Sequence, residues 1–331
     1  MFTSMKRCVY SEKHNGDLEP AVRRGLEFCG LLPAIGSSTR VAIKPNFTYP
    51  YHKSGITTPP GAIRALVHIL KERTDRIAIV ETDGGYGAWR AEEAFAGHGV
   101  FDLAREYGIE AVNLCLEPRD LIDFASRWGT RQVPLPQRLL RDTDILVSMP
   151  VPKVHAMTRL TLSYKNQWGC IPDVMRLRRH HIFNDAIVAI NRRLRPVVVA
   201  DGTWFLDKSG PMDGVPIDMG LVITATYAGA FDRYVSELMG VHYLKVPHLR
   251  RAVALGDMPA TLAEVRCNVP PRSDCKHTFS LERTPRNWIA LGGFNSRFLT
   301  WLGYESWFGR VILHAILYAI VGRPVKPRTT R

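Results

Sequence analysis

The chain has 331 residues, of which 46% are hydrophobic and 23% charged, values that are ordinary for a globular protein with a sizeable core. Its net charge is +13, and more than half of this excess lies in residues 271–331, which hold ten basic and three acidic residues. The six cysteines include no C-x-x-C pair, which excludes zinc-ribbon and ferredoxin-type cluster motifs. We therefore interpret the cysteines as reduced and mostly structural.

The amino-terminal stretch "MFTSMKRCVYSEKHNGD" contains no apolar run of the kind found in signal peptides. A cytoplasmic protein is therefore expected. No internal repeat is evident, and no low-complexity linker occurs before about residue 270. We predict one α/β domain over residues 1–270 and a basic, aromatic-rich appendage over residues 271–331.

Short apolar runs with the character of β-strands recur along the chain. They cover residues 40–47, 76–81, 109–115, 144–150, 195–202 and 220–226. Several of them are continuously apolar instead of alternating, which is typical of strands buried on both faces of a parallel sheet. The sequence therefore predicts an α/β fold with Rossmann-like layers, in which a mainly parallel sheet carries helices on both faces.

Helical patterns lie between these runs. Residues 59–73 begin with prolines that suit a first turn, residues 91–108 are predicted to form two helices, and residues 183–194 have an apolar face. Residues 228–240 end in Gly240, which fits the position after the last helical turn.

Polar residues follow several of the predicted strands at the point where each one ends. They are Lys44, Asn46, Asp83, Lys153, His155 and Asp201. In open α/β sheets, ligands bind in the crevice at the carboxyl ends of the strands, where side chains from different strands converge. A lysine that reaches solvent or an asparagine that caps a turn is the alternative at any single position. The repeated pattern favours a shared ligand site.

The segment 151–172 adds further donors for an anionic ligand, in Lys165 and Asn166. We assign His155 as a candidate acid or base, with Lys44, Lys153 and Lys165 as stabilisers of negative charge. The alternative for His155 is a structural hydrogen-bond donor.

Two other segments offer groups for an anion. In the loop 81–89, Gly84 and Gly85 would let backbone amides face a phosphate or carboxylate, although a flexible turn explains the glycines equally. In the basic run 176–181, Arg176 and His180 are the candidate ligand groups, and a solvated helix face is the alternative.

Aspartates are the candidate ligands for a metal. Asp83, Asp201, Asp207, Asp213 and Asp232 could hold a divalent cation, but they are too far apart in the sequence to form a local metal motif. The cofactor stays unknown: we expect no iron–sulfur cluster and leave a divalent metal open. The Gly-, Pro- and Asp-rich stretch 201–216 is interpreted either as a lid or ligand loop or as an inert surface loop.

Several of these segments together resemble a known family. They are "VAIKPNFTYPYHKSGITTPPGAIRAL", "IAIVETDGG", "PVPKVHAMTRLTLSYKNQWGCIPDVMRLRRH" and "ADGTWFLDKSGPMDGVPIDMGLVITATYAGAFDRYVSELMG". In this order they are similar to the domain-of-unknown-function family 362, over roughly residues 38–258. The most specific features are K-x-H followed by T-x-x-x-K-N-x-x-G, and D-G followed by G-P-x-x-G.

The resemblance implies little chemistry, because members of the family are largely uncharacterised. Some carry a ferredoxin-like iron–sulfur module, and this chain departs from them because its cysteines lack the cluster spacing. The resemblance marks signature positions without assigning a role to any of them. These positions are Lys44, Asn46, Asp83, Lys153, His155, Lys165, Asn166, Asp201, Gly210 and Asp232.

The composition changes in residues 287–331, which hold three of the seven tryptophans. The last apolar run, 307–321, is interrupted by Arg310 and His314, and it is shorter than the roughly 20 residues that span a bilayer. On a helix, Arg310, His314 and Tyr318 would form one polar stripe. The pattern favours a helix lying in an anionic membrane interface, and the alternative is a helix packed on the domain or in a homodimer.

Two functions follow from these observations. The first is an enzyme, of no assigned class, that acts on a phosphate- or carboxylate-bearing small molecule at the carboxyl edge of the sheet. Its catalytic residues would be His155, Lys153, Lys165 and Asp201, and its substrate-binding residues Lys44, Asn46, Asp83, Gly84, Gly85, Asn166, Arg176, His180 and Asp232. The alternative is a non-catalytic anion-binding or scaffold protein docked at the inner face of a membrane. Nucleic acid is not expected as a partner, because no DNA- or RNA-binding motif is present.

Overall fold

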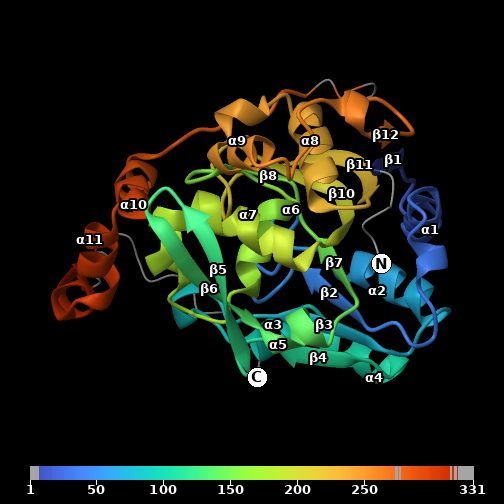
Figure 1. Ribbon diagram of the computed structural model, residues 1–331, viewed down its shortest axis with the longest axis horizontal. Coiled ribbons are helices and arrows are strands. Elements are labelled where there is room, and N and C mark those ends of the chain that lie inside the picture. The colour runs from blue at the N-terminus through green and yellow to red at the C-terminus, as the bar shows by residue number, and fades with distance from the viewer. Residues whose placement is uncertain (1–6, 273–274, 276, 314, 317–318, 320–331) are drawn as a thin grey trace.

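The computed structural model describes residues 7–272, 275, 277–313, 315–316 and 319 (Figure 1). Its strands are β1 (Cys8–Lys13), β2 (Val41–Pro45), β3 (Ile77–Glu81), β4 (Glu110–Asn113), β5 (Arg119–Ser126), β6 (Gly129–Pro136), β7 (Ile145–Met149), β8 (Lys153–His155), β9 (Arg159–Thr161), β10 (Val197–Asp207), β11 (Val215–Ala225) and β12 (Arg266–Cys267).

The α-helices are α1 (Glu19–Phe28), α2 (Pro60–Lys71), α3 (Ala91–Gly97), α4 (Val100–Tyr107), α5 (Gln137–Arg141), α6 (Ser163–Asn166), α7 (Phe183–Leu194), α8 (Ala228–Leu238), α9 (Pro247–Ala254), α10 (Pro285–Asn295) and α11 (Arg297–Thr300). Of the shorter helical turns, η3 (Gln167–Cys170) and η4 (Arg176–Ile182) lie beside the candidate site. Two π-helical turns, η7 (Trp301–Glu305) and η8 (Phe308–Leu313), follow α11.

One sheet runs in the order β12-β1-β11-β10-β7-β2-β3-β4. The strands from β10 to β4 pair in parallel, whereas β11 is antiparallel to both of its neighbours, β10 and β1. The register sets Met149 at the end of β7 opposite Pro45 at the end of β2. The carboxyl ends of the parallel strands therefore meet at one edge.

Successive residues of the strands face two separate cores. Ala42, Leu146 and Val198 belong to the core that contains α5 to α9, whereas Ile43 and Val147 belong to the core that contains α1 to α4. Burial on both faces explains why the strands are continuously apolar. The predicted α/β fold, with a mainly parallel sheet between two helical layers, is confirmed.

The run 220–226 lies within β11, which is antiparallel to its neighbours in the mainly parallel sheet. The interpretation of 201–216 as a loop was wrong. The stretch 201–216 is mostly strand, because β10 continues to Asp207 and β11 begins at Val215. Phe205 and Leu206 are fully buried in β10, and this burial holds the segment in the sheet despite its turn-like composition.

Several strands were not predicted, namely β1, β5, β6, β8, β9 and β12. Strand β1 inserts between β11 and β12. Strands β5 and β6 form a separate antiparallel hairpin, whose turn contains Trp128 and a Gly129 with a positive φ of 85°. The predicted pair of helices within 91–108 is confirmed as α3 and α4.

The carboxyl-terminal appendage begins on the sheet. The backbone of Ser280 bonds to the Asp207 carboxylate and to the Lys208 amide, and α10 and α11 then extend beyond the end of the hairpin (Figure 1). His314 and Tyr318 of the predicted polar stripe lie outside the described residues. Among the residues described, no helix is long and apolar enough to cross a membrane.

A buried ion pair joins the ends of β2 and β3. The Lys44 ammonium lies 2.7 Å from a Glu81 carboxylate oxygen, with both side chains at most 5% exposed. The ammonium also donates to the carbonyl of Pro45 at 2.8 Å, and the carboxylate accepts from the amide of Thr82 at 2.9 Å. Because both charges are desolvated, each depends on the other for compensation.

Removal of one member of this pair is therefore expected to destabilise the protein strongly. Glu81→Gln leaves the Lys44 ammonium buried without a carboxylate, and should lower the free energy of unfolding by about 3–5 kcal/mol. The double variant Lys44→Met/Glu81→Met should recover most of that loss. Urea unfolding measures both, with the exposed Asp102→Asn as a control that should change stability by less than about 1 kcal/mol. A loss of less than about 1 kcal/mol for Glu81→Gln would contradict the strong coupling.

Candidate anion-binding site

The short helix α6 carries Lys165 and Asn166, and a carboxylate on α8 fixes its first turn. The two oxygens of Asp232 accept hydrogen bonds from the backbone amides of Ser163 at 2.8 Å and Tyr164 at 3.1 Å. Asp232 is fully buried, and its burial raises its pKa well above the usual value, although both amide bonds oppose that shift. Asp232, predicted to bind substrate, thus holds the helix that presents Lys165.

Lys165 is half-buried, and its pKa is lowered to about 7. Desolvation is the larger cause of this shift, and the positive charge of Arg176 adds to it. Among the described residues, no carboxylate forms an ion pair with Lys165. The contrast with Lys44 is direct, because Lys44 is buried more deeply but has Glu81 beside it.

Lys153, at the start of β8, is also buried, and it forms no ion pair within the described part of the chain. Its ammonium donates to Ile56 O at 2.6 Å, Thr48 Oγ1 at 3.1 Å and Asn46 Oδ1 at 3.3 Å. These acceptors are all neutral, and burial together with the charge of Lys165 lowers the pKa of Lys153 well below its ordinary value. Lys153 therefore ties β8 to the loop that follows β2, and Asn46 is one of its anchors.

His155 is buried, and its tautomer follows from its contacts. The backbone amides of Met157 and Thr158 donate to Nδ1 at 3.0 and 3.3 Å, so this atom has a lone pair and the neutral ring carries its proton on Nε2. Burial, followed by the charges of Lys165 and Lys153, lowers the pKa of His155 well below its ordinary value. His155 is thus a neutral donor through Nε2.

Two more histidines lie in the same electrostatic neighbourhood. His180 of η4 packs against the ring of Trp168, with ring centroids 5.9 Å apart, and His248 of α9 meets Phe183 edge-on. Burial and the charge of Lys165 lower the pKa of each to about 3. Neither ring nitrogen of the buried His248 has a hydrogen-bond partner among the described residues. An unsatisfied buried histidine of this kind calls for a ligand or water.

We refer to one group of basic side chains as the Lys165 cluster. Its members are Lys153, His155, Lys165, Arg176, His180 and His248. They come from β8, α6, η4 and α9, and the charges that shift the pKa values of Lys153, His155 and Lys165 all come from basic groups. An anion placed there would favour the protonated lysines, which burial now disfavours.

Arg176 lies at the border of the cluster. Its guanidinium donates to the backbone carbonyls of Asp83 at 3.1 Å and Asp173 at 3.3 Å. Burial lowers its pKa, whereas Glu81 and other acidic groups oppose the shift. Arg176 thereby links the Lys165 cluster to the Lys44–Glu81 pair.

Contacts within the protein fix the conformation of the loop 81–89, which contains Gly84 and Gly85. The amide of Gly84 donates to the carbonyl of Trp89, and a Cβ at Gly84 would lie 2.5 Å from the Trp89 ring. A Cβ at Gly85 would meet only Leu177, at 3.9 Å. The Asp83 carboxylate accepts from the amide of Ala91 and from the Asn113 side chain. The structure thus gives Gly84 a packing role and Asp83 a role at the start of α3.

Asn166 and Asp201 have structural partners as well. Asn166 donates to the carbonyl of Lys44 at 3.2 Å and to Ser148 Oγ at 3.0 Å, and so joins α6 to β2 and β7. The Asp201 carboxylate accepts from the amide of Thr203, and its charge raises the pKa of His52 against a larger lowering by burial. No contact joins Asp201 to the Lys165 cluster among the described residues.

The predicted aspartates do not gather into a metal site in the described part of the chain. Asp207 binds His277 at 2.8 Å and the amide of Ser280, whereas Asp232 caps α6. Within the described residues, no three His, Cys, Asp or Glu side chains are placed to hold a metal ion.

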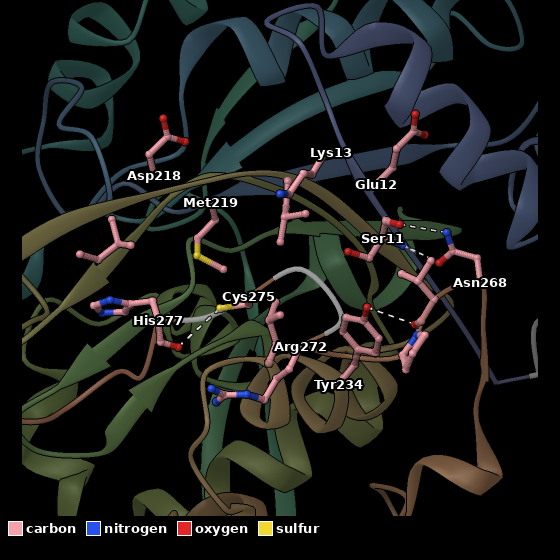
Figure 2. A pocket seen from close by; sticks show the side chains of 15 residues that line it. Ser11, Glu12, Lys13, Asp218, Met219, Tyr234, Asn268, Arg272, Cys275 and His277 are labelled. Atoms are coloured by element: carbon pink, nitrogen blue, oxygen red, sulfur yellow. Dashed lines mark hydrogen bonds between the residues drawn. The ribbon is translucent and has the colours of Figure 1, made fainter.

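A pocket of about 440 Å³ lies elsewhere, between β1, β11, α8 and a segment that contributes Asn268, Val269, Pro270, Arg272, Cys275 and His277 (Figure 2). None of the site residues predicted from the sequence lines it. Its wall mixes acidic and basic groups, among them Glu12, Asp218, Arg272 and His277. The Lys165 cluster is more selectively basic and is therefore the better candidate for an anion.

Sequence reasoning missed His248, and it did not predict that Trp168 packs against His180. His248 lies in α9, outside any polar segment singled out in the sequence, and only the folding of α9 against α7 brings it to the cluster. A histidine after a proline in "KVPHLRR" gives no signal that separates a site residue from a helix start.

Lys165→Met is expected to stabilise the protein in a pH-dependent manner. In the native protein the pKa of Lys165 is about 7, whereas an unfolded lysine titrates near 10.4, so the unfolded state binds more protons between these values. The stability of the wild type should therefore rise with pH from about 7 to about 10 through this group.

The variant Lys165→Met lacks this pH dependence. At pH 7 its free energy of unfolding should exceed that of the wild type by on the order of 3 kcal/mol. Urea unfolding at pH 6, 7, 8 and 9 measures the difference between the two proteins. The exposed Lys245→Met serves as the matched control and should show no such gain. A constant difference between wild type and Lys165→Met across this range would contradict the lowered pKa.

Comparison with known proteins places the chain within a family. A family model described as "Domain of unknown function (DUF362)" matches residues 41–237, which is more than half of the chain. The thylakoid-associated protein sll1697 of Synechocystis sp. is 26% identical over 132 residues, which cover 38% of this chain and 41% of that protein.

A crystal structure of a Thermotoga maritima protein is also similar, with 12% identity and a TM-score of 0.41 over 70% of this chain and 61% of that one. The family match spans β2 to α8 and includes Lys44, Lys153, Lys165 and Asp232. On the extent of that match, the chain belongs to the DUF362 family.

Proposed function

We propose that the protein is an enzyme that binds a small molecule through a phosphate or carboxylate group at the Lys165 cluster. The single observation that carries this proposal is the half-buried Lys165, which has no acidic partner among the described residues and lies near a His248 with two unpartnered ring nitrogens. Burying such groups costs free energy unless a ligand compensates them.

Lys165 is the proposed acid–base residue, in place of His155. A pKa of about 7 lets its amine accept a proton and its ammonium donate one near neutral pH. His155 cannot accept a proton at Nδ1 without losing the bonds from Met157 and Thr158, so it is assigned to orient the ligand through Nε2–H. Arg176 and His180 would contact the anionic group from η4.

The second candidate is a non-catalytic anion-binding or scaffold protein at a membrane surface. It is supported by the exposed aromatic side chains of the appendage, including Trp288, Phe298 and Trp307. A relative bearing the name thylakoid-associated protein agrees with such a location. The two candidates differ in their need for a titrating amine, since a binding protein requires charge at residue 165 and an enzyme requires proton exchange.

Sulfate is a suitable probe, because its charge does not change between pH 6 and 9. Binding of sulfate should favour protonated Lys165, so the affinity of the wild type should rise as the pH falls from 9 to 7 and level off below 7. Lys165→Arg should bind sulfate with an affinity independent of pH, because arginine stays charged. Lys165→Met should bind at least about tenfold more weakly at pH 7.

Isothermal titration calorimetry measures these affinities, with Lys245→Met as the control for loss of one surface charge. Equal sulfate binding by the wild type and Lys165→Met would refute the proposed site. Once a substrate is known, an enzyme requires that Lys165→Arg bind it but turn it over poorly, whereas a binding protein requires full function of Lys165→Arg.

A further inference from the structure

Exposed aromatic residues occur at two places far apart in the sequence. Trp128 is at the turn of the β5–β6 hairpin and is 56% exposed, whereas Trp288, Phe298, Trp301 and Trp307 belong to the appendage and are 48–67% exposed. Large apolar side chains are rarely exposed in such number without a partner surface.

Packing brings the two places together, because α10 and α11 both contact η4, and the amide of Arg127 in the hairpin turn donates to the Asp185 carboxylate of α7, the helix that follows η4, at 3.3 Å. The pKa of His181 on η4 is lowered mainly by burial, and then by the charges of Arg297, Arg131 and Arg127. Arg127 and Arg131 flank the hairpin turn and Arg297 begins α11, so the turn and the appendage both lie beside η4. Figure 1 shows the hairpin and α10–α11 on the same side of the molecule.

The surface is therefore both aromatic and basic. The guanidinium of Arg127 lies 4.8 Å from the ring centroid of Trp128, and Arg127, Arg131 and Arg297 are all exposed. Two nearby acidic side chains have basic partners, since Glu305 lies 3.7 Å from Arg178 and Asp185 lies 2.7 Å from Arg251, whereas Asp123 on β5 accepts from the neutral Gln132. The three exposed arginines outweigh the single charge of Asp123, so the net charge of the surface is positive.

The same surface borders the Lys165 cluster. Its central element, η4, carries Arg176 and His180, which are members of the cluster. Arg283, just before α10, donates to the carbonyl of Ala156 at 2.7 Å, next to His155. A partner bound on this surface would lie beside the elements that form the candidate site.

We propose that the β5–β6 turn and the α10–η8 appendage form one docking surface for an anionic membrane. Tryptophan and phenylalanine rings suit the level of the lipid headgroups, and arginines around them are attracted to anionic lipid. The combination of aromatic rings with arginines that form no ion pair among the described residues favours a lipid surface over a purely apolar protein partner. The inference does not rest on the proposed function of the Lys165 cluster.

Co-sedimentation of the full chain with vesicles tests the proposal. Vesicles of phosphatidylcholine with 30% phosphatidylserine should bind the protein, and vesicles of phosphatidylcholine alone should bind it at least about tenfold more weakly, as should high salt. Trp128→Ser and Arg127→Glu/Arg131→Glu should each weaken binding to the anionic vesicles by about tenfold.

Leu116→Ser and Arg105→Glu are the matched controls, because they remove an exposed apolar group and an exposed arginine elsewhere on the molecule. Both should bind as the wild type does, and thermal unfolding should show that all variants are folded. Unchanged vesicle binding by the two hairpin variants would overturn the proposal, since the appendage alone would then account for docking. Absence of vesicle binding, with a dimer that the hairpin variants abolish, would overturn it in favour of a second copy of the chain.

The outcomes are separable from those of the sulfate experiment. Vesicle binding without sulfate binding contradicts only the proposed site at Lys165. Sulfate binding without vesicle binding contradicts only the docking surface.

Discussion

The arrangement of the candidate site depends on the carboxylate of Asp232. It accepts the first amides of α6 from within the core, at Ser163 and Tyr164, and so fixes a helix that is too short to be stable by itself. Asn166 completes the attachment by binding β2 and β7. Lys165 therefore lies between two anchored positions of α6, and among the described residues it forms no ion pair with a carboxylate.

The buried lysines differ in how their charges are compensated. Lys44 is matched by Glu81, so its charge is compensated inside the protein. Lys153 donates only to neutral oxygens, and Lys165 forms no ion pair among the described residues. Uncompensated burial of this kind costs stability, and such a cost is commonly found where a protein binds or transforms a ligand.

The family membership and the layered fold could be predicted from the sequence, because strands such as 40–47 and 144–150 are apolar without alternation. Parallel pairing then follows from the helices between them. The direction of β11 could not be predicted, since the stretch 201–216 has the composition of a loop, and its pairing depends on burial of Phe205 and Leu206. Strand β1 was missed because its sequence, CVYSEK, includes polar residues and is not continuously apolar.

The site was predicted less completely than the fold. Sequence position set Lys44 at the end of β2, but Asp201, predicted to follow a strand, lies within β10, and the sequence could not show which polar residues are paired. Asp232 and Asn166 have structural partners, whereas His248 joins the cluster only through the packing of α9. Such pairing depends on contacts between residues distant in the chain, which local composition does not encode.

The ionisation of Lys165 is the measurement that tests this account most directly. Heteronuclear NMR of lysine-labelled protein, with Lys165→Arg used to assign the signal, follows the side chain through a pH titration. The account predicts a pKa near 7 for Lys165 in the free protein and a higher value when sulfate is present. A pKa close to the ordinary lysine value, unaffected by sulfate, would contradict it.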